Sequence, residues 1–398
     1  MVHPGSSAGA SMTPAKHADA GCVEVMALQP VAVVDHLGAV STEFLRRNVA
    51  ISGHELGGSE RVDPATLASL LSKLEAGGTE LSVVTKAGGS AANTARGLSR
   101  GFGVKAGLLG AVGDDEWGTV FKDAVCAAGV DVSNLLEKPG ATGRCACFVE
   151  RGSGQRTMRT CLQDAVRLEA REIRARSEPG EVPGSNPLRG ASWVLIPGYA
   201  FYGAGLVDAA VAAAAEGNCK VALALASFEI VRAFGAQIEA LMRSGRVSAV
   251  FANEDEAREV AVRGGSRSEE KQNVSAESSF GASETTADRA LDVLTRWSPA
   301  CVAVVTLGDE GCVAARGHPG DVTSERVACE AFEEIVALDS TGAGDLFVSG
   351  FLYGLLREST LGECAEMGCL AGAAATQSVG AEVSDEGWAW VRDRRPVE

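Results

Sequence analysis

The stretch DSTGAGDLF, residues 339–347, places two glycines and an alanine between two aspartates and then runs into an apolar segment. A turn of Gly342, Ala343 and Gly344 that opens a helix at about Asp345 would point several backbone N–H groups at one spot, where the helix dipole favours an anion. A carboxylate there could accept a hydroxyl proton while the amides hold a phosphoryl group. The spacing suggests phosphoryl transfer to an alcohol; an aspartate that only caps the helix is the structural alternative.

The composition of the whole chain narrows the class of partner. Its 398 residues are 46% hydrophobic, enough for one large core or two ordinary ones. A net charge of −16 disfavours nucleic acid and anionic membranes, and no apolar run reaches the ~18 residues that span a bilayer. We therefore expect a small-molecule partner, no nucleic acid, no membrane, and a monomer or homodimer.

The eleven cysteines show no CxxC pair and no zinc-like spacing with the five histidines. Cys145 and Cys147 are same-face residues of a predicted strand, and we interpret them as core rather than as ligands. Free thiols indicate a reducing compartment, so we expect a cytoplasmic protein. The small, polar residues 1–27 are predicted to be a disordered tail, with an organelle address as the alternative.

Apolar runs alternate with helical patterns along most of the chain. This alternation predicts an α/β fold, a doubly wound and mostly parallel sheet with helices on both faces, and an active site at the carboxyl ends of its strands. One folded domain is expected over residues 28–390, followed by a tail of 391–398. The expected strands are 31–37, 81–87, 104–112, 192–198, 220–226, 247–253 and 301–308.

Three segments interrupt this rhythm. Parts of 36–86 and the segment 141–165, which alternates around a Gly-Ser-Gly turn, are predicted to form a small β lid over the strand ends. Residues 262–286 are rich in Ser, Gly and charge, which is typical of a flexible, solvated insertion.

Polar side chains follow several of the predicted strands. Gly88 and Gly89 would let the backbone approach a bulky ligand, and Asn93 lies one turn into the next helix, where its amide could bind hydroxyl groups. Asp35, at the end of the first predicted strand, is a second candidate for binding a diol. A carboxylate that faces water is the alternative for Asp35.

Asn253 and Glu256 lie one helical turn apart directly after the strand 247–253. Their oxygens could position a hydrated Mg²⁺, or they could form a capping-box arrangement at the helix start. Gly308 and Gly311 lie in a tight turn between strands, which is either a simple hairpin or a loop that faces a nucleotide.

The order and spacing of these motifs resemble the ribokinase/PfkB family of kinases over about residues 28–390. GGSAAN (88–93) looks like its N-terminal signature, GAVGDDEWG (110–118) like a family turn, NEDE (253–256) like its N-x-x-E motif, TLGDEG (306–311) like its nucleotide loop, and DSTGAGD (339–345) like its C-terminal signature. The resemblance implies a ribokinase-like fold and transfer of the γ-phosphoryl group of ATP to a hydroxymethyl group.

The resemblance also implies a role for each candidate residue. Asp345 would be the base and Gly342, Ala343 and Gly344 the anion hole. Asp35, Gly88, Gly89 and Asn93 would hold the acceptor. Thr306, Gly308 and Gly311 would line the ATP site, Asn253 and Glu256 would organise Mg²⁺ and phosphate, and Asp339 would help to build a monovalent-cation (K⁺) loop.

The acceptor implied by the resemblance is a purine nucleoside. The long span between Asp35 and Gly88 is more like adenosine kinase than like ribokinase or fructokinase. Tyr199 or Phe201 would stack on the base, or would belong to the core, and Arg156 resembles an arginine near the transferred phosphate. A sugar kinase of the fructokinase or ribokinase type is one alternative, and a non-catalytic fructokinase-like scaffold is another. Cys369 departs from the polar amide that relatives often carry there.

Overall fold

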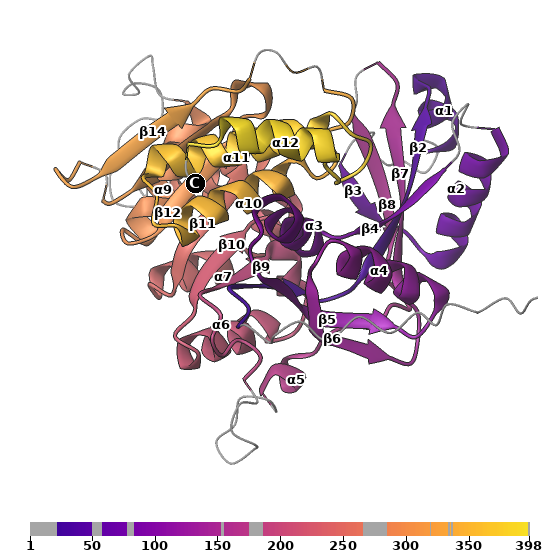
Figure 1. Cartoon of the computed structure of the whole chain (residues 1–398), viewed down its shortest axis with the longest axis horizontal. Helices are drawn as coiled ribbons and strands as arrows, with labels where there is room; N and C mark the ends of the chain where they lie inside the picture. Colours follow the sequence, from indigo (N-terminus) through magenta and orange to yellow (C-terminus); the bar gives the residue numbers. More distant parts are fainter. Residues whose placement is uncertain are drawn as a thin grey trace, which may run out of the picture.

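The computed structural model describes residues 22–49, 58–77, 83–152, 155–174, 186–265, 285–318, 320–332, 335 and 337–396. It consists of a nine-stranded sheet between two layers of helices and a separate five-stranded sheet (Figure 1).

The nine-stranded sheet forms the body of the molecule. Its order is β14-β13-β12-β11-β10-β9-β1-β5-β6, and the strands from β12 to β6 are all parallel. Only β13 and β14 are antiparallel, at one edge. The strands are β1 (Val25–Gln29), β5 (Ala106–Gly113), β6 (Asp131–Lys138), β9 (Trp193–Pro197), β10 (Lys220–Ala224), β11 (Val247–Asn253), β12 (Val302–Thr306), β13 (Cys312–Arg316) and β14 (Glu325–Cys329).

Helices bury both faces of this sheet, as the continuous apolar strands predict. Within β1, Val25 and Ala27 pack into one core, whereas Met26 and Leu28 pack into the other. The first face is covered by α3 (Ser90–Arg96), α4 (Glu116–Ala127), α10 (Ala343–Leu356), α11 (Leu361–Thr376) and α12 (Asp385–Arg394). The second is covered by α5 (Ala170–Arg174), α6 (Leu206–Glu216), α7 (Phe228–Arg243), α8 (Glu254–Gly265) and α9 (Thr286–Trp297).

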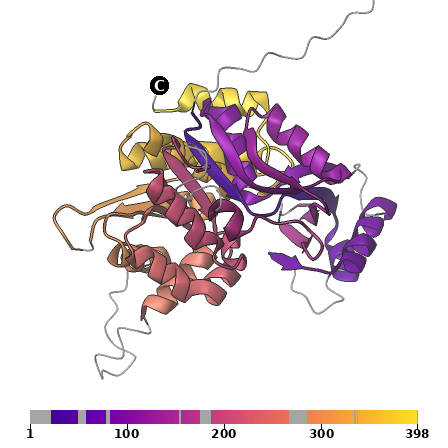
Figure 2. The same cartoon turned by 90° about the horizontal axis from the view of Figure 1, so that it is seen from below.

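The five-stranded sheet is the predicted β lid, and its order is β3-β8-β7-β2-β4. Figures 1 and 2 show it to one side of the body, with α1 and α2 against it. Its elements are β2 (Val33–Val40), α1 (Thr42–Asn48), β3 (Ser59–Arg61), α2 (Pro64–Gly77), β4 (Val84–Gly88), β7 (Gly143–Glu150) and β8 (Arg156–Cys161). The hairpin expected within 141–165 is the antiparallel pair β7–β8.

Two predicted body strands belong to the lid instead. The runs 31–37 and 81–87 correspond to β2 and β4, which pair antiparallel with each other in the smaller sheet. Val34 of β2 and Ala87 of β4 still pack into the body core, whereas Val40, at the far end of β2, packs into a separate lid core with Leu45 of α1, and Phe44 packs against that core. The prediction that these two strands belong to the body sheet was therefore wrong. The reason is that the composition of a strand buried in the lid does not differ from that of a strand buried in the body.

The domain boundaries also differ from those expected. The central strand β1 begins at Val25, inside the predicted tail of 1–27, and α12 continues to Arg394, past the predicted end at residue 390. Residues 1–21 of the predicted tail and 266–284 of the predicted insertion lie outside the described residues.

Two further observations concern the cysteines and the helices. All eleven cysteines fall in the described part of the chain, and all are free thiols. Among the helices described, none combines the length and the apolar character that crossing a bilayer requires.

Candidate active site

Asp345 is the third residue of α10, and its carboxylate is held by side chains of another helix. Ser90 Oγ donates to Oδ1 at 2.6 Å, and Asn93 Nδ2 donates to Oδ2 at 2.8 Å. The N-cap of α10 is Gly342, so the alternative in which Asp345 only caps the helix is not what the structure has. Burial raises the pKa of Asp345, while the two hydrogen bonds and the nearby arginines lower it. The result is a fixed carboxylate whose pKa is moved toward that of a general base.

The start of α10 presents backbone N–H groups beside this carboxylate. Gly342 adopts a left-handed conformation, with φ 75°, that lets the chain turn into the helix. Within the described residues, the N–H groups of Gly342, Gly344 and Asp345 have no partner, whereas that of Ala343 donates to Ser340 O at 3.2 Å. A Cβ at Gly344 would contact no protein atom, which leaves open space in front of the helix. This end of α10 therefore suits an anion.

Asp35 lies on β2 of the lid and faces the same cleft. Its carboxylate is half-buried and has no hydrogen-bond partner among the residues that the structure describes. Burial raises the pKa of Asp35 to about 7, against the lowering effect of Arg96 and Arg156 and together with repulsion from Asp345. An unpaired carboxylate in a cleft is a ready acceptor for hydroxyl groups of a ligand.

Gly88 and Gly89 both lie against protein side chains. A Cβ at Gly88 would overlap the carboxylate of Asp35, and a Cβ at Gly89 would overlap the amide of Gln29. These glycines make room for protein side chains, Gly89 also lines a pocket between the lid and the body, and contact of either glycine with a ligand stays a prediction. Gln29 Oε1 in turn accepts the N–H of Ala92 at 3.1 Å, which fixes the first turn of α3.

Asn93 is buried, and both ends of its amide are engaged within the protein. In addition to its bond to Asp345, its Oδ1 accepts from Arg96 Nη2 at 2.6 Å. Arg96 also contacts Glu382, and Glu382 pairs with Lys86. Asn93 therefore orients the carboxylate of Asp345, and its binding of the acceptor stays a prediction.

A pocket of about 760 Å³ joins these groups between the lid and the body. Asp35, Arg156, Tyr199 and Asp345 all line it, and so do Ser90 and Asn93. Arg156 reaches across the cleft from β8, where Nη1 donates to Ser340 O at 2.6 Å. The apolar part of the wall comprises Val31, Val33, Met158, Leu162, Leu168, Pro197 and Leu206.

Tyr199 is one of two tyrosines, with Tyr202, that line this pocket. It lies in the 3₁₀ turn η3 (Gly198–Tyr202), is 37% exposed, and donates from its hydroxyl to Ala226 O at 3.3 Å. Ala226 has φ 66°, a strained conformation for an alanine and one that clusters at functional sites. Phe201, the other predicted candidate, stacks on Phe234 and belongs to the body core.

Asn253 and Glu256 form the capping arrangement that was the alternative to metal binding. Glu256 N donates to Asn253 Oδ1 at 2.9 Å, and Asn253 N donates to Glu256 Oε2 at 3.0 Å. Glu256 is buried, and burial raises its pKa to about 7, with a lowering contribution from the Asn253 N–H and a raising one from Asp255. These two oxygens are occupied by the backbone, so they do not fit direct ligation of Mg²⁺.

The predicted nucleotide loop lies at the carboxyl ends of the neighbouring strands. Thr306 pairs with Asn253 in the β11–β12 register. Gly308 and Gly311 flank the 3₁₀ turn η5 (Gly308–Glu310), with φ 61° and 91°. A Cβ at Gly311 would overlap the carbonyl oxygen of Cys329, so this turn requires glycine. Thr306, Gly308 and Gly311 are not among the residues that line the 760 Å³ pocket.

Asp339 is fully buried before α10 and supports the loop that leads into it. Oδ1 accepts from Thr341 N at 2.8 Å and from Thr341 Oγ1 at 2.6 Å, and Oδ2 accepts from Gly380 N at 2.7 Å. These three bonds give Asp339 a structural role in the loop.

Sequence reasoning missed several residues of the site. Ser90 lies inside the quoted GGSAAN motif, so its position after two glycines was an available signal. Arg96 donates to Asn93 Oδ1 and is itself held by Glu382, 286 residues away in the chain. No local pattern predicts the contact with Glu382. Tyr202 lines the pocket and lies under the guanidinium of Arg61 of the lid, 3.9 Å from the ring centre.

Known proteins share this sequence pattern and this architecture. The pfkB family of carbohydrate kinases matches residues 66–387. Adenosine kinase of Schizophyllum commune is 30% identical over 296 residues, which cover 73% of this chain and 78% of that protein. The structure of adenosine kinase from Sinorhizobium meliloti is similar with a TM-score of 0.72 and 27% identity, covering 94% of this chain and 99% of that one.

Two further structures support the same fold. A probable sugar kinase from Rhizobium etli has a TM-score of 0.71 at 25% identity and covers 93% of this chain and 98% of its own. Ribokinase from Thermotoga maritima, at 16% identity and a TM-score of 0.60, covers 94% of this chain and all of its own and shares the fold alone. The match over residues 66–387 places this chain in the pfkB family of carbohydrate kinases, which are phosphotransferases that use ATP.

Proposed function

We propose that this kinase transfers the γ-phosphoryl group of ATP to the 5′-hydroxyl of a purine nucleoside. The observation that carries the proposal is the shared pocket of Asp345 and Asp35. One carboxylate is fixed by Ser90 and Asn93, and the other has no partner among the described residues. A ribosyl group needs both, one for the reacting hydroxyl and one for the ring hydroxyls.

The proposed reaction uses groups that surround Asp345. Asp345 accepts the proton of the 5′-hydroxyl, and the 5′-oxygen of the nucleoside forms the new bond to the γ-phosphorus as the bond between that phosphorus and the bridging oxygen breaks and ADP leaves. The N–H groups of Gly342, Gly344 and Asp345 and the guanidinium of Arg156 offer donors to the transferred oxygens. Thr306, Gly308 and Gly311 remain the predicted nucleotide loop.

The pocket wall supports a nucleoside over a simple sugar. A sugar needs hydroxyl partners only, whereas a purine also needs apolar surface and a ring on which to stack. Tyr199 and the apolar residues of the 760 Å³ pocket supply both. The name of the Schizophyllum commune relative, adenosine kinase, agrees with this choice.

Cations are part of the proposal. Because the backbone occupies Asn253 Oδ1 and Glu256 Oε2, Mg²⁺ would reach this motif through water. Glu256→Gln should raise the Mg²⁺ concentration needed for half-maximal activity more than it changes the acceptor KM. Early melting with an unchanged Mg²⁺ dependence would instead assign Glu256 to the helix cap. A K⁺ requirement near Asp339 and a cytoplasmic location also remain predictions.

The experiment that tests the acceptor is a comparison of turnover on adenosine, inosine, guanosine, ribose and fructose with ATP. We expect kcat/KM to be highest for a purine nucleoside. Turnover of ribose or fructose with none on the nucleosides would establish the sugar-kinase alternative. No turnover on any of them, with ATP bound, would favour the scaffold alternative.

A further inference from the structure

Two cysteines lie directly beside Asp35 in the lid sheet. Cys145 and Cys147 are on the same face of β7, and their Sγ atoms are 3.6 Å apart. Asp35 is the register partner of Cys145 on β2. One carboxylate oxygen and the two sulfurs all lie within 4.8 Å of one another. Sequence spacing alone cannot show this group, because the third member comes from another strand.

The spacing of the three atoms matches a metal coordination shell. Thiolates bind Zn²⁺ at about 2.3 Å with tetrahedral angles, which puts two sulfur ligands about 3.8 Å apart. The observed separation of the Cys145 and Cys147 sulfurs is close to this value. Two soft sulfurs with one carboxylate favour a thiophilic cation over Mg²⁺ or Ca²⁺.

The group is open to ligands on one side only. Cys145 and Asp35 line the 760 Å³ pocket, whereas Cys147 is fully buried behind them. Thr160 Oγ1 donates to Cys145 Sγ at 3.2 Å and thereby helps to hold that sulfur in place. A bound ion would have three protein ligands and an open position that faces the pocket.

We propose that Asp35, Cys145 and Cys147 form a binding site for a thiophilic divalent cation of the Zn²⁺ type, which blocks the pocket when it is filled. Binding moves to solvent the two thiol protons, and the carboxyl proton of Asp35 wherever that group is protonated, and leaves one net negative charge on two thiolates, one carboxylate and the ion. Arg156, which lines the same pocket, faces that charge. Competition with the acceptor follows because the ion takes the Asp35 carboxylate, and this consequence rests on the proposed function.

A second sulfur pair shows what distinguishes this group. Cys312 and Cys369 are 3.7 Å apart, and Cys329 is the register partner of Cys312. None of these three lines the 760 Å³ pocket, and none belongs to a group of three metal-ligating side chains found among the described residues. Sulfur proximity alone is thus not the basis of the proposal; the carboxylate and the open side are.

The test is a titration of the reduced, chelator-treated whole chain with Cd²⁺, followed by the thiolate-to-cadmium charge-transfer absorption. We expect Cys147→Ser to bind one ion fewer than the wild type, or to bind that ion at least about tenfold more weakly. Mutation of a residue that only supports a metal ligand already weakens metal affinity by at least about tenfold. Cys126→Ser, which removes a lone exposed thiol on α4, should match the wild type. Equal stoichiometry and affinity in Cys147→Ser would overturn the proposal.

A second variant protects the test against a folding defect. Asp35→Asn keeps both thiols, and competition for Zn²⁺ with a chromophoric chelator should show at least about tenfold weaker binding to it. Unchanged Zn²⁺ affinity in this variant would also overturn the site. Adenosine should weaken Cd²⁺ binding to the wild type. Adenosine that raises Tm without this effect would disprove the shared use of Asp35, whereas adenosine that does not bind at all would count against the proposed function instead.

Discussion

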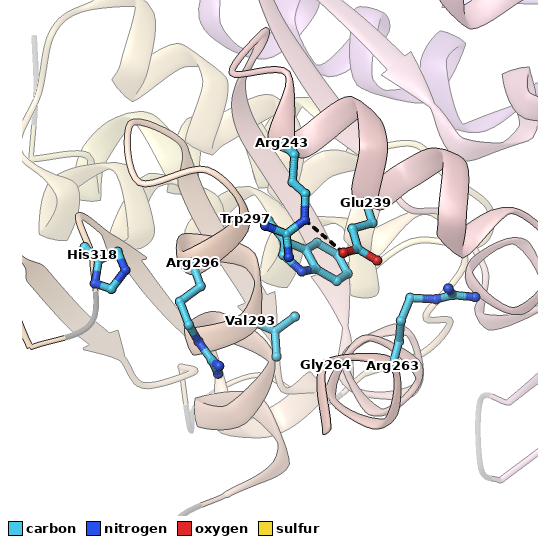
Figure 3. Close-up of a pocket in the computed structure, with 8 residues that line it drawn as sticks. All are labelled: Glu239, Arg243, Arg263, Gly264, Val293, Arg296, Trp297 and His318. Atoms are coloured by element: carbon cyan, nitrogen blue, oxygen red, sulfur yellow. Dashed lines mark hydrogen bonds and ion pairs between the residues drawn. The ribbon is translucent and has the colours of Figure 1, made fainter. Parts of the chain in front are cut away.

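The molecule gathers charged side chains at both ends of its nine-stranded sheet, with different results. At the carboxyl ends of the strands, Asp345 and Asp35 face a pocket beside the start of α10. At the opposite ends, a cavity of about 350 Å³ is lined by Glu239, Arg243, Arg263, Gly264, Val293, Arg296, Trp297 and His318 (Figure 3). Three arginines line this cavity, as many as line the pocket of Asp345 and Asp35, but the two sets are arranged differently.

The arginine cavity has a structural explanation. Arg243, Arg263 and Arg296 lie in the last turns of α7, α8 and α9, where cations offset the negative ends of the helix dipoles. Arg243 pairs with Glu239 at 2.9 Å, and Arg296 Nε donates to Asp292 O at 3.1 Å. Figure 3 shows these guanidinium groups pointing in different directions. Arg243 and Arg296 are thus partnered within their own helices, whereas in the pocket of Asp345 the carboxylate of Asp35 has no hydrogen-bond partner among the described residues and can accept from a ligand.

The largest effect should follow from Asp345→Asn, which removes the base but keeps the shape of the side chain. We expect kcat to fall by about 10²–10⁴-fold, the usual range for loss of a general base. The hydrogen bond from Ser90 can persist, so ATP binding and Tm should change little. Steady-state kinetics and thermal unfolding measure the two parts.

The matched control lies at the other end of the sheet. Glu239→Gln makes the same carboxylate-to-amide change at a buried residue of the arginine cavity. It should lower Tm and leave kcat unchanged. Near-normal turnover of Asp345→Asn would refute its role as the base, and the contrast between the two ends would fail with it.

The next effect concerns Tyr199→Ala. Loss of the ring should weaken the nucleoside kcat/KM by the equivalent of about 1–3 kcal/mol, the range for base stacking on aromatic side chains. Any activity on ribose or fructose should be nearly unchanged, because a sugar has no base to stack. Tyr199→Phe keeps the ring and removes only the bond to Ala226 O, so it is the control. An equal loss for nucleoside and sugar would show that the ring shapes the pocket without stacking.

A smaller effect concerns stability and the pH. Because the pKa of Asp35 is raised to about 7 in the folded chain from an ordinary value of 3.8, its contribution is fully present below about pH 4 and is lost as pH rises through 7. Asp35→Asn removes this loss, so above pH 7 it should be more stable than the wild type by about 1–2 kcal/mol, allowing for solvent in the open pocket. The difference should vanish near pH 4.

Urea unfolding at pH 5 and pH 8 tests this sign. His36 acts in the opposite direction, since burial and Arg144 lower its pKa to about 4, and its contribution is lost as pH falls from 6.5 through 4. Comparing the variant with the wild type at each pH cancels this contribution. If the variant and the wild type differed by the same free energy of unfolding at pH 5 and at pH 8, the surroundings of Asp35 would not raise its pKa.

The sequence predicted the parts of the site that are local. The turn and helix around Asp345 follow from a few adjacent residues, and the helix begins at Ala343, two positions earlier than expected. The layers of the body also follow from pattern, because strands buried on both faces must be continuously apolar. Five of the seven predicted strands belong to the body sheet.

The rest depended on contacts between distant segments. Whether β2 and β4 join the lid or the body is decided by their partners, not by their composition. The role of Gly88 is set by Asp35, a residue of another strand. The engagement of Asn93 depends on Arg96, whose own position depends on Glu382. These contacts join segments that are far apart in the sequence, so a local pattern cannot predict them.

The smallest effect should come from the arginine cavity itself. Arg243→Gln removes an i, i+4 ion pair and a cation from the last turn of α7, and the Arg243 side chain is 52% exposed. Such pairs and dipole contacts together contribute about 0.5–1 kcal/mol to stability. We therefore expect a small fall in the urea midpoint, one that shrinks in high salt, and no change in kcat, KM or nucleotide binding. A loss of activity from Arg243→Gln in a fully folded enzyme would mean that this end of the sheet communicates with Asp345, and the structural explanation of its charges would then be incomplete.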